Sequence, residues 1–551
     1  MPQDIYDKIM MLAKRRGFIY PSFEIYGGVA GFFDYGPLGS QLKNNLENLW
    51  RNFYIAQDNC VEINTPVITL QEVLQASGHV DEFTDLTIDC KKCKKSYKVE
   101  DIIEGEMTVE KAIKKQQVTC PSCSTHLTDP YPVNLMFTTS IGPTEGRKAF
   151  LRPETAQGIF TNFHLLYRYN REKLPCGVIQ IGKGFRNEIS PRQGMIRQRE
   201  FSMAEAEIFF DPTEKIHPKY NEIKKKKMIL FDNKDNYRIS VEEAVTKNII
   251  NNQALAYYMY HTQDFLLSAG IDPKKCRFRK HGADELAHYA TECWDAELYS
   301  ERFGWVECVG IADRSAYDLA AHIKASGIDM HAVRKYDKPK VVKVQKIVPK
   351  MDVLGPLFKG KAGQIKEKLE SLEVTGDTTL SLTIDDKSLE IPSNCYDIQK
   401  TKETVAGEKF VPHVIEPSYG IDRIVYFVLE HTYHEGKKKE EEYHSLKLPF
   451  CIAPIKVGVF PLLNEKKLNA IALEIEKELR KATIATYYDT SGSIGRRYAR
   501  MDEIGTPFCI TVDHDTLQDG TVTIRDRDTT QQIRKKKEEV LPYLLSNPFT
   551  N

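Results

Sequence analysis

The spacing of apolar residues predicts a chain in which helices and strands alternate. Leu42, Leu46 and Trp50 recur at intervals of four, so they form one apolar face of a long helix. Residues 131–325 repeat a pattern of aromatic-rich strands and amphipathic helices. After residue 447, short apolar runs again alternate with helical patterns, which is typical of a compact α/β module. The sequence therefore predicts a globular protein with several domains.

The most informative pattern is a pair of strands, residues 177–188 and 199–209, joined by a polar loop. Because side chains alternate between the two faces of a strand, one face of this hairpin combines arginine, glycine, glutamate and phenylalanine. Arginine suits a phosphate group, and phenylalanine can stack on a nucleotide base. The residues of that face are Gln180, Gly182, Gly184, Arg186 and Glu188 on the first strand and Arg199, Phe201, Met203, Glu205 and Glu207 on the second. The hairpin is thus a candidate nucleotide site, although a salt-bridged hairpin facing solvent would show the same pattern.

Other stretches differ in composition from this core. Residues 85–130 are polar and rich in lysine, and residues 326–400 form a second lysine-rich segment with alternating strand patterns. Both are predicted to be insertions. Residues 436–446 are charged and turn-rich, which predicts a linker. The module that follows, residues 447–551, is predicted to end in a helix over residues 528–545.

Four of the twelve cysteines form two pairs in the first insertion. Cys90 and Cys93 make one C-x2-C knuckle, Cys120 and Cys123 make another, and 26 residues separate the knuckles. Two such knuckles supply the four thiolates of a tetrahedral zinc site, which has no open position and is structural. Four unrelated thiols, or a redox pair, are less consistent with this spacing and context.

Composition and charge set limits on the function. The 551 residues include 77 Lys and Arg against 77 Asp and Glu, so a nucleic-acid partner has to be met by local basic patches. No stretch approaches the roughly 20 consecutive apolar residues of a membrane span. The first residues have neither the pattern of a signal peptide nor that of a transit peptide. We expect a cytoplasmic protein with no membrane partner.

Three segments resemble the signature motifs of the class II aminoacyl-tRNA synthetases. Residues 185–188 and the loop after them resemble motif 2. Residues 416–423 resemble motif 3, with Asp422 where a more glycine-rich form is common. The helix that ends near Phe53, with the strand up to Pro66, resembles motif 1, the dimer element.

Within that class the chain is similar to the α2-type glycyl-tRNA synthetases over almost its whole length. The matching strings are residues 27–39, 77–80, 134–137, 151–158, 293–297 and 312–315. The resemblance implies an α+β fold, with a catalytic domain built on an antiparallel sheet flanked by helices. Zinc-knuckle and second insertions would interrupt it, and a C-terminal α/β anticodon-binding domain would follow. The catalytic parts would be residues 1–84, with motif 1, 131–325, with motif 2, and 401–435, with motif 3.

The resemblance implies a reaction in two steps. Glycine and ATP give glycyl-adenylate and pyrophosphate, and the glycyl group then moves to the 3′ end of tRNA(Gly). Such chemistry depends on positioning and on stabilising charge at phosphorus. Arg186, Glu188 and Arg423 would carry the catalysis, and Glu307 would help to hold Mg²⁺ with ATP. The residues implied to bind ATP are Arg186, Asn187, Glu188, Arg197, Gln198, Phe201, Glu307, Cys308 and Arg423.

Glycine offers no side chain to bind, so a specific site holds its ammonium and carboxylate groups and excludes anything larger. The residues implied for this pocket are Glu154, Glu205, Glu416 and Ser418. Steric exclusion of an added methyl group discriminates strongly, so we expect no editing domain.

The resemblance also implies a homodimer and RNA contacts in the C-terminal module. Candidates for these contacts, each equally consistent with a salt-bridged surface residue, are Arg496, Arg497, Arg500, Arg525 and Arg527. Two other functions stay open. One is a synthetase-like protein that binds RNA without catalysis, which the retained arginines and carboxylates argue against. The other is a class II ligase for alanine, serine or proline, which the glycine-type strings argue against.

Overall fold

The protein is described here from a computed structural model. The residues described are 4–99, 102, 119–143, 146–191, 193–232, 234–282, 290–371, 380–384, 387–438 and 441–546. The chain forms two compact units, Met1–Met330 with Pro412–Asn551, and His331–Val411, and each is considered by itself. Among the residues described, no helix combines the length and the apolar character needed to cross a membrane.

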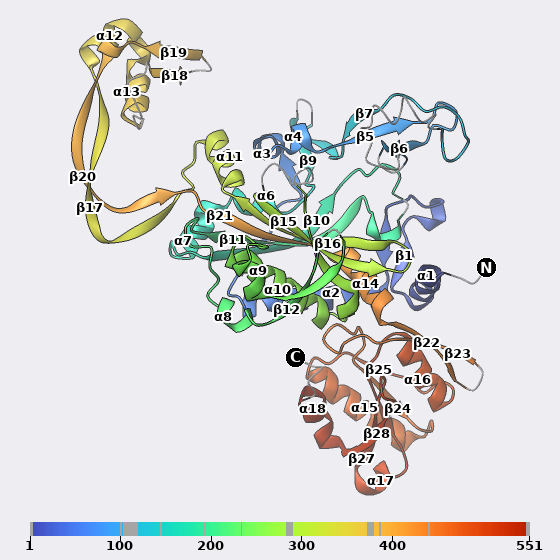
Figure 1. Ribbon diagram of the computed structural model, residues 1–551. Helices are drawn as coiled ribbons and strands as arrows, with labels where there is room; N and C mark the ends of the chain where they lie inside the picture. The colour runs from blue at the N-terminus through green and yellow to red at the C-terminus, as the bar shows by residue number, and fades with distance from the viewer. Residues whose placement is uncertain are drawn as a thin grey trace. The chain divides into compact units, whose positions relative to one another are not determined.

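A nine-stranded, mostly antiparallel sheet forms the centre of the first unit (Figure 1). Only the pairings of β3 with β10 and of β12 with β14 are parallel. The order of the strands is β13 (Asn236–Ser240), β12 (Lys227–Phe231), β14 (Cys276–Lys280), β15 (Glu292–Ser300), β16 (Gly304–Ser315), β21 (His413–Gly420), β11 (Glu200–Phe210), β10 (Cys176–Phe185) and β3 (Val61–Glu62). This agrees with the antiparallel catalytic sheet that was expected.

Three long helices, α2 (Pro37–Arg51), α10 (Gln253–Ser268) and α14 (Ile421–Thr432), lie together on one face of the sheet (Figure 1). The predicted apolar face of α2 (Pro37–Arg51) is confirmed, since Leu42, Leu46 and Trp50 are buried. The ring of Trp50 meets that of Tyr419 on β21 edge-on, with 5.6 Å between the ring centres. The shorter helices of this part are α1 (Ile5–Arg16), α3 (Gln71–Ala76), α4 (His79–Glu82), α6 (Ala156–Phe160), α7 (Phe163–Tyr169), α8 (Tyr220–Ile223), α9 (Val241–Thr246) and α11 (Tyr317–Ser326).

The predicted hairpin is present as β10 and β11. Gln180 lies opposite Glu205, and Gly184 lies opposite Phe201, so the two predicted polar rows share one face. Glycine is required at residue 184, because a Cβ atom there would lie 2.8 Å from Cε2 of Phe201 and 2.9 Å from Sδ of Met203. The absence of a side chain on β10 therefore makes room for the aromatic ring on β11.

Two small sheets are formed by segments that precede this hairpin in the chain. The cysteine-bearing segment contains β5 (Thr84–Asp89), β6 (Ser96–Lys98) and β7 (Tyr131–Asn134), with β5 in the middle. A second three-stranded sheet has the order β4 (Ile68–Leu70), β9 (Arg147–Leu151) and β8 (Thr138–Ile141).

The C-terminal module is the α/β domain that the sequence predicts. Its five strands lie in the order β25 (Thr486–Tyr488), β24 (Val457–Pro461), β26 (Phe508–Val512), β27 (Thr521–Asp526) and β28 (Gln532–Lys536). Its helices are α15 (Lys466–Lys481), α16 (Ile494–Glu503), α17 (Thr516–Asp519) and α18 (Lys537–Ser546). The predicted helix over 528–545 is wrong in its first half, because Gln532–Lys536 pairs with β27 instead.

The segment predicted as a linker, residues 436–446, is also different in the structure. It belongs to a hairpin of β22 (Tyr433–Lys438) and β23 (Glu441–Leu446), in which Tyr433 lies opposite Leu446. Leu446 is fully buried in the main core. Burial therefore fixes the base of the hairpin, where β22 begins and β23 ends. The charged residues between these points give no indication of it in the sequence.

The second unit is a long two-stranded ribbon with a small domain at its tip. The ribbon pairs β17 (Ala332–Pro349) with β20 (Tyr396–Phe410), and the tip contains α12 (Met351–Phe358), α13 (Ala362–Ser371), β18 (Leu380–Ile384) and β19 (Lys387–Ile391). The insertion was expected over 326–400. Residues 401–410, predicted as part of the core, belong to β20, because Ala332 pairs with Phe410 at the base of the ribbon.

Candidate active site

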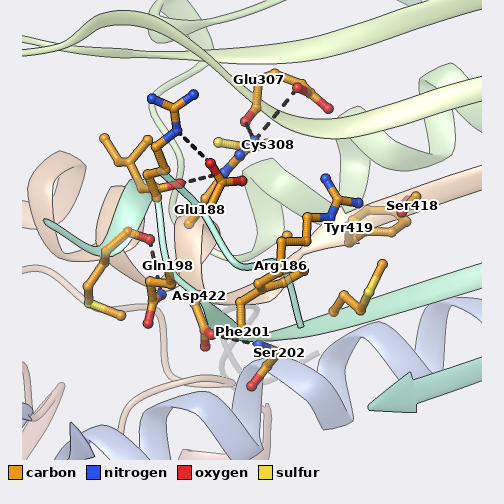
Figure 2. A pocket seen from close by; sticks show the side chains of 16 residues that line it. Arg186, Glu188, Gln198, Phe201, Ser202, Glu307, Cys308, Ser418, Tyr419 and Asp422 are labelled. Atoms are coloured by element: carbon orange, nitrogen blue, oxygen red, sulfur yellow. Dashed lines mark hydrogen bonds and ion pairs between the residues drawn. The ribbon is translucent and has the colours of Figure 1, made fainter. Parts of the chain in front are cut away.

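A cleft of about 660 Å³ opens on the polar face of the β10–β11 hairpin (Figure 2). Residues from β16, β21 and the start of α14 complete its walls. The lining residues are Arg186, Glu188, Met195, Ile196, Arg197, Gln198, Phe201, Ser202, Met203, Glu307, Cys308, Ser418, Tyr419, Gly420, Asp422 and Arg423. The cleft thus brings together residues from motif 2, motif 3 and β16.

Arg186 occupies a position between two aromatic rings. Its guanidinium carbon lies 5.4 Å from the ring centre of Phe201 and 5.3 Å from that of Phe83. Its Nε atom donates a hydrogen bond to the backbone oxygen of Pro153 at 3.3 Å. A cation held over aromatic faces in this way keeps its remaining donors free for a phosphate.

Opposite charges face each other across the cleft. Arg197 approaches Glu188 with 3.1 Å between Nε and Oε2. Arg423 donates to the backbone oxygens of Ile196 at 2.9 Å and Glu307 at 2.6 Å, and Oε2 of Glu307 lies 3.7 Å from its Nη1. Backbone oxygens and ion pairs therefore hold these arginines at the cleft, where a phosphate would compete with the carboxylates for them.

Asn187 is the one predicted nucleotide residue that does not line this cleft. Its backbone nitrogen donates to Leu135 at 2.7 Å, and the residue borders a neighbouring hollow with Tyr131 and Ser190. The alternation of the strand ends at Phe185, so sequence spacing alone does not fix the direction of the residues that follow.

Asp422 has a structural role that the sequence did not indicate. Its Oδ1 accepts a hydrogen bond from the Tyr35 hydroxyl at 2.5 Å, and its Oδ2 accepts one from the backbone nitrogen of Ser202 at 2.6 Å. Asp422 is buried. Burial of the Tyr35 hydroxyl, together with the neighbouring charge of Asp422, raises the pKa of Tyr35 well above its ordinary value. The carboxylate therefore joins α14 to β11 beside Arg423.

A buried acidic region adjoins the cleft. Oε2 of Glu205 accepts hydrogen bonds from the backbone nitrogen of Thr155 at 2.7 Å and from its hydroxyl at 2.5 Å. Oε1 of Glu205 accepts one from the hydroxyl of Ser418 at 2.9 Å. Glu416 accepts a hydrogen bond from Arg314 at 2.8 Å, and Arg314 also makes two 2.8 Å contacts with Asp318. The structure thus brings three of the four predicted glycine-binding residues together.

Glu154, the fourth, is held from another direction. Its two oxygens face Nε2 of His79 at 3.3 Å and Nε2 of Gln157 at 3.0 Å. Burial opposes the shift, but His79, Arg314 and Gln157 together lower the pKa of Glu154. Glu154 lines a cavity with Arg152 and Thr65, and it does not line the main cleft.

Sequence reasoning missed the partners that hold these carboxylates. In the sequence, Arg314 and His79 stand only within the strings that resemble the family, and Glu207 stands only in the polar row of the hairpin. Asp313 and Arg314 follow directly after the small and apolar residues 308–312 of β16, and charged residues at the end of such a run are a sequence signal of buried ion pairs. The hydrogen bond of Gln157 to Asp318 joins segments 161 positions apart, and the sequence carries no local sign of it.

The four paired cysteines form one cluster of thiols (CYS4 cluster: Cys90, Cys93, Cys120 and Cys123). The sulfur atoms of Cys90 and Cys123 are 3.4 Å apart, and those of Cys93 and Cys120 are 3.6 Å apart. These distances are close to the edge of about 3.8 Å in a tetrahedron with 2.3 Å metal–sulfur bonds. Desolvation opposes the shift, but hydrogen bonds from Tyr97 and the Ser122 backbone lower the pKa of Cys120 to about 6. The cluster has the donors and the spacing of a zinc site.

Three of the five arginines named for RNA contacts are buried and already paired. Arg497 donates to the backbone oxygens of Pro461 and Leu462, Arg525 pairs with Asp502, and Arg527 donates to the oxygens of Leu448 and Gly505. Arg496 and Arg500 instead border a surface hollow at the start of α16 with Ser491 and Gly492. These two of the five are the ones at the surface, although Arg500 is itself paired with Asp489 at 2.9 Å.

Comparison with known proteins assigns the chain to a family. Residues 137–432 match the tRNA synthetase class II core domain (G, H, P, S and T), and residues 451–547 match the anticodon binding domain. Two solved structures share the fold at low identity. The prolyl-tRNA synthetase of Giardia lamblia has a TM-score of 0.55, 15% identity, and coverage of 98% of this chain and 74% of its own. The structure described as the RNA binding domain of the threonyl-tRNA synthetase of Cryptosporidium parvum has a TM-score of 0.54, 16% identity, and coverage of 98% of this chain and 99% of its own. The chain belongs to the class II aminoacyl-tRNA synthetases.

Relatives of higher sequence identity show which family within class II the chain belongs to. The glycine–tRNA ligase of Methanothrix thermoacetophila is 47% identical and covers 96% of this chain and 95% of its own. That of Methanocaldococcus jannaschii is 47% identical over 99% of both chains, and that of Archaeoglobus fulgidus is 48% identical over 98% and 96%. Within class II, the chain is a member of the glycine–tRNA ligase family.

Proposed function

We propose that this protein activates glycine with ATP and transfers the glycyl group to the 3′ end of tRNA(Gly). The observation that carries the proposal is the cleft of Arg186, Glu188, Phe201 and Arg423 beside the carboxylates of the buried acidic region. The first set suits a nucleotide, and the second suits an ammonium group. Family membership, with 47% identity over nearly the whole chain, supports the same reaction.

The roles of the nucleotide residues follow from charge and distance. Arg186 is assigned to the α-phosphate, where charge develops as the glycine carboxylate attacks, and Arg423 to the γ-phosphate. Phe201 is assigned to the adenine ring. Glu188 keeps Arg197 at the edge of the cleft until the phosphates bind. The enzyme therefore acts by orientation and electrostatic stabilisation.

The glycine pocket is assigned to Glu205, Glu416 and Ser418, with Glu154 as a supporting negative charge. Three hydrogen bonds fix Glu205, and Arg314 fixes Glu416, so neither carboxylate has freedom to adjust to a larger substrate. A rigid pocket of this kind rejects a Cβ atom by overlap.

Two metal ions are part of the proposal. Mg²⁺ neutralises phosphate charge when it is bound with ATP, and the carboxylate of Glu307, at the exposed rim of the cleft, offers an oxygen ligand of the preferred kind. Zinc would be held by the CYS4 cluster in a closed, structural site. The reduced thiols that zinc requires are consistent with a cytoplasmic location.

The remaining parts concern tRNA and a second copy of the chain. The C-terminal domain is assigned to anticodon binding, with Arg496 and Arg500 as candidate contacts. A homodimer is proposed through α2 and the edge strand β3, the elements that resemble motif 1. The ribbon of residues 331–411 is proposed to cover the tRNA acceptor stem, and charging that is unchanged after its deletion would remove this role.

The first experiment is ATP–pyrophosphate exchange with glycine, alanine, serine and proline in parallel, followed by charging of tRNA(Gly). Exchange with glycine alone is the expected result. Exchange with another amino acid would be consistent with a class II synthetase and would overturn the assignment of the pocket to glycine. A folded, zinc-loaded protein that exchanges with none of them would favour the reading of a non-catalytic RNA-binding protein.

A further inference from the structure

Three glutamates lie close together at the candidate glycine pocket, and the mechanism above gives no role to one of them, Glu207. Glu205, Glu207 and Glu416 each offer a carboxylate oxygen within 4.8 Å of the others. The register of β11 against β21 brings Glu207 and Glu416 to neighbouring strands, since Glu205 lies opposite Ser418 and Ile208 opposite Ile415. Like charges at this range cannot all be ionised in a buried site.

Glu207 is the member that lacks partners. Its side chain is 0% exposed, and neither of its carboxylate oxygens has a hydrogen bond. An ionised carboxylate left in this state is costly, whereas a neutral carboxylic acid has an O–H to donate. Glu205 differs, because its two oxygens accept three hydrogen bonds.

The surroundings do not supply enough positive charge. Arg314 is the nearest cation, and it is shared between Glu416 and Asp318. The charged and titratable groups that face the pair, among the residues described, are Glu205 on β11, Arg314 on β16, Asp318 and His322 on α11, Glu154 before α6, and His79 on α4. Burial lowers the pKa of His322, so that histidine adds no charge near neutral pH.

We propose that Glu207 and Glu416 share one proton while the glycine pocket is empty, and that this proton leaves when the ammonium group of glycine binds. The inference rests on the proposed function. The O–H bond of the shared carboxyl breaks, the proton passes to solvent, and the substrate's ammonium takes its place as the positive group. Glu207 is thus a positioning residue that sets the charge of Glu416.

The electrostatics of the site agree with this assignment. Burial raises the pKa of Glu207 well above its ordinary value, and the charge of Glu416 adds to the effect. Burial also raises the pKa of Glu416, to about 8, against the influence of Arg314. The empty pocket therefore holds the proton below about pH 8. A cation bound beside Glu416 lowers that pKa, so glycine binds more tightly as the pH rises towards 8 and levels off above it.

Calorimetry of the full-length wild-type protein tests the proposal directly. Glycine is titrated at pH 7 in two buffers of different ionisation enthalpy, and the difference in heat gives the number of protons released. We expect a value close to one. The KM for glycine in ATP–pyrophosphate exchange should fall about tenfold per pH unit from pH 6 to about pH 7.5. The KM for ATP, measured in the same assays, serves as the internal control.

Two variants distinguish loss of the shared proton from a general effect of the substitution on the structure. In Glu207→Gln the amide donates to Glu416 without a titratable proton, so proton release should drop towards zero and the KM for glycine should lose its slope between pH 6 and 8. Glu430→Gln is the matched control, since Glu430 is also buried with one oxygen lacking a partner but lies at the far end of α14. It should keep the wild-type profile.

The outcomes are distinguishable. Glycine binding with heat that is independent of the buffer overturns the shared proton and leaves the proposed function standing. Protein that neither binds glycine nor exchanges pyrophosphate with it overturns both. If Glu207→Gln does not fold, the wild-type calorimetry still decides the question by itself.

Discussion

Replacing Asp422 by asparagine removes a buried charge that joins the start of α14 to β11. The two carboxylate oxygens accept from the Tyr35 hydroxyl at 2.5 Å and from the Ser202 backbone at 2.6 Å. Hydrogen bonds to a charged group contribute about 1.5–3 kcal/mol each. Asparagine keeps one carbonyl oxygen and turns an NH₂ group towards the other donor. We therefore expect Asp422→Asn to lower the free energy of unfolding by about 2–3 kcal/mol.

The assay is equilibrium unfolding in urea followed by tryptophan fluorescence. The three tryptophans of the chain are Trp50 on α2, Trp294 on β15 and Trp305 on β16, so the signal reports on the catalytic core. Because Arg423 follows Asp422 directly, the KM for ATP should rise in the same variant.

A double-mutant cycle with Tyr35→Phe isolates the contact. Since the two residues share one hydrogen bond, the double variant should cost less than the sum of the single ones by about 1 kcal/mol or more. A loss below about 0.5 kcal/mol for Asp422→Asn, or strictly additive effects, would refute the reasoning.

Three further changes test other parts of the structure. Cys90→Ser should reduce the zinc content of the purified chain, measured by plasma mass spectrometry, from about one ion to near zero, and unchanged zinc would contradict the assigned cluster. Gly184→Ala should raise the KM for ATP by about tenfold with little effect on the KM for glycine, because its Cβ atom would lie 2.8 Å from the ring of Phe201. Burial lowers the pKa of His261 to about 4, so the unfolded chain binds that proton more readily and the free energy of unfolding falls as the pH drops from about 6.5 to about 4. His261→Gln should reduce this slope in urea titrations, and an unchanged slope would show that other groups cause it.

Local periodicity accounts for the parts of the fold that the sequence predicts. The alternation of β10 and β11 is enough to assign Gly184 and Phe201 to one face, because a strand has a period of two. The four-residue spacing of Leu42 and Leu46 likewise predicts the buried side of α2. Patterns of this kind arise within a single helix or strand, so they can be interpreted without knowing which elements pack against it.

Contacts between distant segments account for the parts that the sequence does not predict. Glu154 is oriented by His79, 75 positions earlier in the chain, and Glu416 by Arg314 on the neighbouring strand. The charged sequence of β22 and β23 predicts a linker, because the apolar residues that anchor the hairpin, such as Leu446, lie only where its two strands begin and end. In each case a tertiary contact decides the geometry, and composition carries no trace of it.

The ribbon of β17 and β20 bears on how the chain assembles. Pairing of β16 with β21 has to bring Ser315 next to Val414, 99 positions further along the chain. Closing a flexible loop costs conformational entropy that grows as (3/2)RT ln n. Once the ribbon has formed, Ala332 already lies beside Phe410, and the effective loop shrinks to about 21 residues. The gain of about 1.4 kcal/mol corresponds to roughly tenfold faster closure, so an early-forming insertion lowers the kinetic barrier to the central sheet.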